Sequence, residues 1–238
     1  MKRTFFLIIF LFSIISCDCQ NWGQRCKESY KEGCAALEAE NYGSAILYFN
    51  DAIQFYQGQA EIYYKRGFSK LMTEDYHGAI VDFSKAIVIN PKYAVAYRNR
   101  GISKDNLKDY RGAIADFNKA IEINPKDAIA YSCRGDSKAE QKNYRGAIID
   151  YNNGIMINPK DAYAYYQRGD SKAKLKDYKG AIADYSRVIV INPKEADAYY
   201  QRGLLKIKLG QKNSGCIDLS KSGELGNNVY ETIKKYCN

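Results

Sequence analysis

The 238-residue chain has very few of the residues that carry most enzyme chemistry. It has one histidine, one tryptophan, three methionines and four prolines. The single histidine, His77, has no partner that the sequence identifies, and no C-x-x-C pair accompanies it. A nucleophile-elbow motif and a phosphate-binding glycine loop are also absent. We therefore expect a protein that is not an enzyme and that needs no metal or cofactor.

The chain also lacks any block of five or six like charges, although 36 basic and 27 acidic residues give a net charge of +9. Its basic residues are dispersed along the sequence. Nucleic-acid binding usually relies on basic residues that gather in a patch or stripe, whereas dispersed charge is typical of a solvated face. The charge pattern therefore argues against nucleic acid as a partner.

Long apolar runs are absent except at the start. Residues 5–15 are apolar apart from Ser13, and they follow Lys2 and Arg3. As a helix this run would span about 16 Å, whereas the hydrocarbon core of a bilayer is about 30 Å thick. The run is too short for a transmembrane helix and is typical of a signal peptide.

The residues from Ile14 to Cys17 resemble the lipobox of bacterial lipoproteins, in which the cysteine is lipidated and becomes the new N-terminus. The resemblance implies that residues 1–16 are a signal peptide and that Cys17 carries lipid. Residues 17–25 would then tether the protein to a bacterial membrane, facing the periplasm or the cell surface. The alternative is cleavage nearby, for example before Gln20, which would release a soluble secreted protein.

The chain has seven cysteines. If Cys17 carries lipid, six remain in an oxidising compartment. Cys26 and Cys34 are eight residues apart on what we predict to be one helix, about 12 Å of rise, which is too far for a disulfide. Cys216 and Cys237 bracket the last predicted helical hairpin. We expect these two to form a disulfide.

A 34-residue period dominates the sequence. The glycines of this period are Gly33, Gly67, Gly101, Gly135, Gly169 and Gly203. A tyrosine stands four residues before each of the last five glycines, and another stands nine residues after each of the first five. An alanine follows three residues later, and Asn-Pro closes four of the units.

This register closely resembles that of the tetratricopeptide repeat (TPR) family, across six units from residue 26 to residue 222. The resemblance implies an all-α solenoid, a right-handed superhelix of stacked helix-turn-helix units. Residues 223–238 would form a C-terminal capping helix.

The chemistry of one unit, residues 128–161, supports the same fold. Gly135 has no side chain, so a second helix can approach it closely. Ala147 would face the first helix at the tightest point, where a larger side chain would overpack. Asn143 can cap the second helix of the unit, and Asp161 can cap the helix that follows.

Charged residues recur with the same period. An arginine precedes five of the glycines, at Arg66, Arg100, Arg134, Arg168 and Arg202. An aspartate follows each arginine by sixteen residues, at Asp82, Asp116, Asp150, Asp184 and Asp218. The arginines could form a ladder for acidic ligands, but we favour ion pairs in which each arginine binds an aspartate of its own or an adjacent unit.

In the TPR family, one face of each first helix lines a concave groove in which peptides dock. The matching positions here are Tyr30, Tyr64, Phe68, Arg98, Ile102, Asp136, Tyr163, Tyr166, Asp170 and Tyr200. We expect Tyr64, Phe68, Tyr166 and Tyr200 to be binding hot spots, unless some of them contact the preceding unit instead. Asp136 and Asp170 would lie in an open groove, where nothing would exclude water or raise a pKa.

The best-known TPR ligand mode grips the C-terminal carboxylate of cytosolic chaperones through Lys and Asn residues. The matching positions are Tyr30 and Cys34 in the first unit, and Ser132 and Asp136 later, so this clamp is missing. The sequence therefore predicts an exported adaptor or assembly scaffold that binds proteins or peptides. The alternatives are a soluble secreted module that self-associates into homo-oligomers, and one that binds cell-wall or carbohydrate material.

Overall fold

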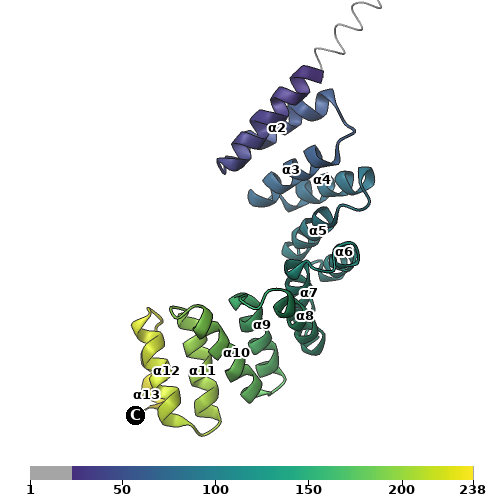
Figure 1. Ribbon diagram of the computed structural model, residues 1–238. Coiled ribbons are helices and arrows are strands. Elements are labelled where there is room, and N and C mark those ends of the chain that lie inside the picture. Colours follow the sequence, from purple (N-terminus) through teal and green to yellow (C-terminus); the bar gives the residue numbers. More distant parts are fainter. Residues whose placement is uncertain (1–22, 238) are drawn as a thin grey trace, which may run out of the picture. The chain divides into compact units, whose positions relative to one another are not determined.

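The computed structural model describes residues 23–237, which form α-helices joined by short turns (Figure 1). No strand occurs in this part of the chain, and the all-α fold class is confirmed. The predicted signal peptide and Cys17 lie outside the described residues. Residues 23–25, which the sequence assigned to the tether, belong to the first helix, residues 23–38. Near the start of this helix, the Cys26 thiol donates a hydrogen bond to the Ala52 carbonyl oxygen of the next helix at 3.5 Å.

The helices form consecutive hairpins, which divide into two compact units. The N-terminal unit, up to Ile123, holds three hairpins that we call repeats one to three. They pair residues 23–38 with α2 (Tyr42–Phe55), α3 (Ala60–Met72) with α4 (Tyr76–Ile89), and α5 (Ala94–Asn106) with α6 (Tyr110–Ile123). Within this unit each hairpin packs against the next.

The C-terminal unit, from Asn124 onward, holds repeats four to six and one further helix. The repeats are α7 (Ala128–Glu140) with α8 (Tyr144–Ile157), α9 (Ala162–Lys174) with α10 (Tyr178–Ile191), and α11 (Ala196–Lys208) with α12 (Lys212–Glu224). The chain ends with α13 (Tyr230–Tyr236). Each of these elements again packs on its neighbour in sequence.

The helices begin where the side-chain caps predict. The Asn143 carboxamide oxygen accepts a hydrogen bond from the Gly146 amide at 3.0 Å, and the Asp161 carboxylate accepts one from the Ala164 amide at 3.1 Å. Lys142, just before the cap of α8, has a φ of 61°, a left-handed conformation that turns the chain sharply between the two helices. Both predicted caps are confirmed.

In repeats one to five the glycine allows an aromatic ring to lie directly on the first helix. A methyl group at Gly135 would come within 2.7 Å of Tyr151 Cε1, and one at Gly101 would come within 2.7 Å of Phe117 Cε1. Tyr151, Phe117 and Ala147 are almost completely buried. The predicted close approach at Gly135 is therefore confirmed, and the core of each of the first five hairpins is an aromatic ring on a glycine, whereas Gly203 of repeat six faces Leu219.

The repeating arginines and aspartates are ion pairs inside the hairpins. Arg168 donates from Nε and Nη2 to the two oxygens of Asp184, at 3.0 and 2.6 Å, and Lys172 pairs with the same carboxylate at 2.8 Å. Arg168 Nη1 also donates to Asn152 of the preceding repeat at 2.6 Å. The same arrangement of Arg and Lys recurs at Asp82, Asp116, Asp150 and Asp218. The ion-pair interpretation is confirmed, and the lysine in each pair is a partner that the sequence analysis missed.

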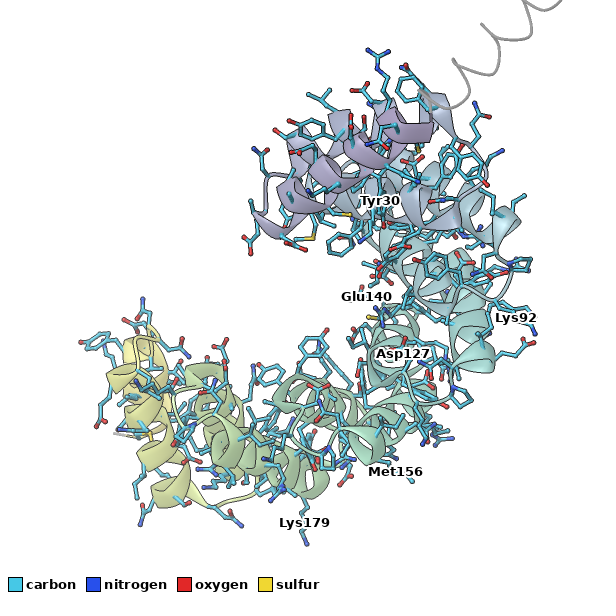
Figure 2. The ribbon with its side chains drawn as sticks, turned by 45° about the horizontal axis from the view of Figure 1, so that its top comes forward. Tyr30, Lys92, Asp127, Glu140, Met156 and Lys179 are labelled. Carbon is cyan, nitrogen blue, oxygen red and sulfur yellow. A yellow bond between two sulfur atoms is a disulfide. The ribbon has the colours of Figure 1, made fainter. Side chains whose placement is uncertain are left out.

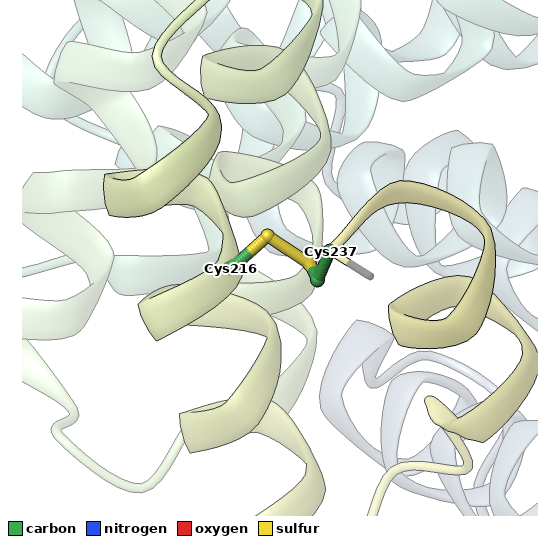
Figure 3. Close-up of a disulfide and its surroundings, with 2 residues drawn as sticks. All are labelled: Cys216 and Cys237. Carbon is green, nitrogen blue, oxygen red and sulfur yellow. A yellow bond between two sulfur atoms is a disulfide. The ribbon is translucent and has the colours of Figure 1, made fainter.

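The C-terminal helix is an incomplete seventh repeat. α13 begins at residue 230, which is 34 residues after the start of α11 at residue 196. Cys216 and Cys237 form a disulfide with their Cα atoms 5.7 Å apart (Figure 3). Cys237 follows Gly203 by 34 residues, so it occupies the position that the glycine has in the other repeats. The disulfide therefore attaches this half-repeat to α12 through that position. The sequence analysis assigned residues 223 and 224 to the C-terminal cap, but they belong to α12, which ends at Glu224.

Candidate functional site

In the N-terminal unit, the first-helix face of repeat two carries an aromatic cluster. The ring of Tyr64 lies 5.0 Å from that of Tyr93, 5.8 Å from Phe83 and 6.5 Å from Phe68, between ring centroids. Asn99 of repeat three donates a hydrogen bond to the Tyr64 hydroxyl at 3.1 Å. Tyr64 and Phe68 are half-buried, and burial raises the pKa of Tyr64. Tyr64 therefore supports the packing of two repeats, and the repeat that it contacts is the following one, not the preceding one that the sequence analysis considered.

The remaining candidates of this unit are also half-buried. The ring of Tyr30 lies 6.1 Å from that of Phe49, and Lys65 Nζ stands 6.0 Å from the Tyr30 centroid. Arg98 and Ile102 lie one helical turn apart on α5. Each of these side chains keeps only part of its surface exposed.

In the C-terminal unit, the two acidic candidates are held by tyrosine hydroxyls. Asp136 accepts hydrogen bonds from Tyr151 at 2.8 Å and from Tyr163 at 2.9 Å. Asp170 accepts one from Tyr185. Tyr151 and Tyr185 have buried rings, so they act as core residues whose hydroxyls reach the first-helix face.

Two adjoining cavities lie on this part of the unit. The first, about 360 Å³, lies between α7 and α9, and the second, about 350 Å³, lies between α9 and the start of α11. Residues lining the first include Asp136, Glu140, Lys142, Tyr151, Gln167, Asp170 and Lys174. Residues lining the second include Tyr163, Tyr166, Gln167, Val188, Glu195 and Asp197. Figure 2 shows Glu140 on one side of this unit and Met156 and Lys179 on the opposite side.

The protonation of these groups follows from their burial. Burial raises the pKa of the Asp170 carboxyl, and the Tyr185 hydrogen bond and the Lys174 charge offset this only in part. The expectation that nothing here would raise a pKa was wrong, because Asp170 is half-buried and burial disfavours its charged form. Burial and the charges of Asp170 and Asp197 raise the pKa of Tyr166 to about 12. Burial likewise raises the pKa of Tyr185, so its hydroxyl stays protonated and remains a donor.

Tyr200, the last candidate, meets the C-terminal half-repeat. Its hydroxyl lies 3.4 Å from the Thr232 hydroxyl on α13. The chain itself therefore occupies part of the Tyr200 surface. By contrast, Tyr163 is 51% exposed and Tyr166 lines an open cavity.

The sequence analysis named both acids but did not connect them with the core tyrosines. In repeats four and five the residue after the glycine is Asp, and the second-helix residue fifteen positions later is Tyr. In the other repeats from the second onward, both positions are apolar: Phe68 with Phe83, Ile102 with Phe117, and Leu204 with Leu219. Both positions therefore change from apolar to polar in the same two repeats. This pattern in the sequence could have identified the Asp136–Tyr151 and Asp170–Tyr185 pairs.

Two family models match the chain. One, described as tetratricopeptide repeat, matches residues 94–127, which hold repeat three, and another, described as TPR repeat, matches residues 169–210. The matched spans coincide with hairpins whose glycine, aromatic and capping residues are described above. The chain is a tetratricopeptide repeat protein. The comparison with curated proteins found no match to this chain.

Solved TPR structures share the fold. PilF of Pseudomonas aeruginosa matches with a TM-score of 0.76 at 14% identity, over 90% of this chain and 99% of that one. MamA of Desulfovibrio magneticus matches with a TM-score of 0.67 at 18% identity, over 72% and 97%. YrrB, described as a TPR protein with an unusual peptide-binding site, matches with a TM-score of 0.65 at 19% identity, over 76% and 93%. The all-α TPR solenoid is therefore the fold of this chain.

Within residues 23–237, no helix is long and apolar enough to cross a membrane. The same described residues contain no group of three His, Cys, Asp or Glu side chains placed to hold a metal ion.

Proposed function

We propose that this TPR protein is a non-catalytic adaptor or assembly scaffold that binds a protein or peptide segment on the first-helix face of its C-terminal unit. The observation that carries the proposal is the exposed Tyr163 beside the cavity that Tyr166 lines. Tyrosine contributes a large contact area while only two side-chain torsions are frozen, and for this reason it is favoured at interfaces.

The geometry of the two units distinguishes the candidate residues. Tyr64 stacks against Tyr93 and Phe83, so its ring already has partners. Tyr166 has an edge-to-face contact with Tyr185 at 5.5 Å and presents the rest of its surface to the cavity. The proposal therefore assigns binding to Tyr163 and Tyr166 first, and a packing role to Tyr64. The peptide-binding description of YrrB agrees with this use of the fold.

Export and membrane tethering are the second part of the proposal. The signal-peptide pattern of residues 5–15 and the lipobox-like Cys17 support it. The disulfide between Cys216 and Cys237 also favours an oxidising compartment, since such bonds are rare in the cytosol.

Site-specific photo-crosslinking in the native host tests the binding face. A photoreactive phenylalanine analogue would be placed at Tyr163 and, as the matched control, at Val190. Val190 is 68% exposed and lies on a second helix of the same unit. We expect a discrete cross-linked partner from position 163 and none from position 190. The same adducts from both positions would move the binding surface away from the first-helix face, and adducts with cell-wall polymer alone would favour the carbohydrate alternative.

Membrane fractionation tests the anchor. We expect the wild-type chain in the membrane fraction and the Cys17→Ser variant outside it. A wild-type chain found in the soluble secreted fraction would favour cleavage near Gln20 instead.

A further inference from the structure

The strongest unexplained feature is the pair of Asp–Tyr substitutions in repeats four and five. Repeat three has Ile102 and Phe117 at the corresponding positions, an apolar pair that needs no hydrogen bond. Repeat five places Asp170 against Tyr185 at the same register, and Asp170 is half-buried. Burying a carboxylate costs free energy that an apolar pair does not. Two neighbouring repeats therefore carry a costly polar pair that the fold itself does not require.

Asp170 differs from the structural aspartates in its surroundings. Asp184, on the partner helix of the same hairpin, is bound by both Arg168 and Lys172. Among the residues that the structure describes, Asp170 has no cation within ion-pair distance, and its only hydrogen-bond donor is the neutral Tyr185 hydroxyl. Tyr185 bonds to Oδ1, which leaves Oδ2 of Asp170 with no donor among those residues. A neutral donor fixes the position of the carboxylate and leaves its negative charge in place.

The cavity that Asp170 lines has the size and charge for one basic side chain. Its volume of about 360 Å³ is at the small end of ligand pockets, which span about 300–1,000 Å³. Asp136 and Asp170 are its half-buried charges, whereas Lys142 and Lys174 are exposed at its rim. Charges in a partly buried position are screened less than those on an exposed rim, so the interior favours a cation although the whole chain is basic.

We propose that the cavity between α7 and α9 binds the lysine or arginine side chain of a peptide ligand, with Asp170 as its counter-ion. The adjoining cavity of Tyr163 and Tyr166 binds the apolar or aromatic side chain next to it in the ligand. Gln167 borders both cavities, so the two side chains come from one short segment. The inference rests on the proposed function, because it names the class of peptide that the same face recognises.

A random-peptide display selection on the immobilised full-length chain tests this inference. Three variants are compared with wild type. Asp170→Asn keeps an oxygen acceptor for Tyr185 and removes the charge. The double variant Asp170→Ile/Tyr185→Phe installs the apolar pair of repeat three, and Glu224→Gln removes an exposed charge on α12 as the matched control. Both changes at Asp170 remove a buried charge, so these variants are expected to stay folded, which circular dichroism checks.

We expect wild type to enrich peptides in which a lysine or arginine adjoins an apolar residue. The affinity of the best peptide, remade synthetically, should fall about 10- to 100-fold in both Asp170 variants and stay unchanged in Glu224→Gln. Enriched peptides that have no basic residue, or that bind the Asp170 variants equally well, would overturn this inference and leave the proposed function standing. If wild type enriches no peptide, both proposals fail.

Discussion

Asp170 and Asp184 are the same side chain in one hairpin, yet their surroundings give them different roles. Asp184 is buried between an arginine and a lysine, so its charge is compensated and it joins the two helices. Asp170 is held by a phenol that cannot compensate its charge, and burial raises its pKa. The first arrangement stabilises the repeat, whereas the second costs stability and keeps a charge available to a ligand.

A charge reversal tests the structural role. Asp150 is completely buried and pairs with both Arg134 and Lys138. Asp150→Arg would place three cations together without a counter-charge, and we expect a loss of about 3–5 kcal/mol in the free energy of unfolding. Urea denaturation followed by circular dichroism measures it. Glu224→Gln, which breaks an exposed pair on α12, should leave the unfolding midpoint unchanged, and an unchanged midpoint for Asp150→Arg would contradict the ion-pair role.

At Asp170, in contrast to Asp150, we expect removal of the charge to increase the stability of the fold. Its pKa is raised in the folded protein, so the folded state binds the proton more tightly than the unfolded state does, and stability falls as the pH rises through this window. The titratable groups around it or lining the same cavity are Tyr185, Lys174, Tyr166, Asp136, Glu140, Lys142, Tyr144 and Tyr151. Asp170→Asn should therefore melt at a higher temperature than wild type at pH 7, with the difference disappearing on acidification below the pKa of a free Asp carboxyl. Thermal melts between pH 3 and pH 7 measure this, and a variant that melts lower at pH 7 would show that the charge stabilises the fold.

At the scale of the elements, each hairpin depends on one close contact between its two helices. In the first five repeats the glycine of the first helix lies against a buried aromatic ring of the second, and in repeat six Gly203 lies against Leu219. The same register places Cys237 where the next glycine would stand, so the disulfide takes over the role of this contact at the end of the chain.

Two glycine substitutions separate packing from helix propensity. Gly135→Ala brings a methyl group within 2.7 Å of the buried Tyr151 ring, and we expect a loss of about 1–3 kcal/mol through overpacking. Gly43 in α2 has nothing within 4 Å of the corresponding position. Gly43→Ala should therefore stabilise by up to about 1 kcal/mol, because alanine is the better helix former. Equilibrium unfolding of the two variants compares them, and equal effects would contradict the role of close contact at Gly135.

At the scale of the whole molecule, stability is distributed along the sequence. Each hairpin packs against the hairpins next to it in its own unit, as expected for repeat proteins. A substitution that destabilises one repeat should therefore increase local unfolding in that repeat, while distant repeats stay folded.

Hydrogen exchange measured by mass spectrometry tests this distribution. Asp82→Asn weakens the ion pairs of repeat two, and Asp184→Asn weakens those of repeat five. We expect faster exchange in α3 and α4 for the first variant and in α9 and α10 for the second. An equal rise throughout the described chain in either variant would indicate a single cooperative unit instead.

The periodic sequence was enough to predict the fold class, the helix caps, the glycine contacts and the arginine–aspartate pairs. These features are local or repeat every 34 residues, so each residue's role can be inferred from its spacing alone. The lysine that completes each ion pair was missed because lysine is common on exposed helix faces, where it usually has no fixed partner.

The sequence by itself determined that this protein is a stack of TPR hairpins, because apolar periodicity and close-contact glycines restrict the chain to that packing. Only the tertiary structure decided which candidate residues contact other parts of the chain and which border cavities. Tyr64 and Tyr200 contact other parts of the chain, whereas Tyr163, Tyr166 and Asp170 border open cavities. Whether a side chain contacts the chain or borders a cavity depends on neighbours that lie 15 to 35 residues away in the sequence. Sequence spacing cannot show how much of such a side chain its neighbour covers and how much stays exposed to water.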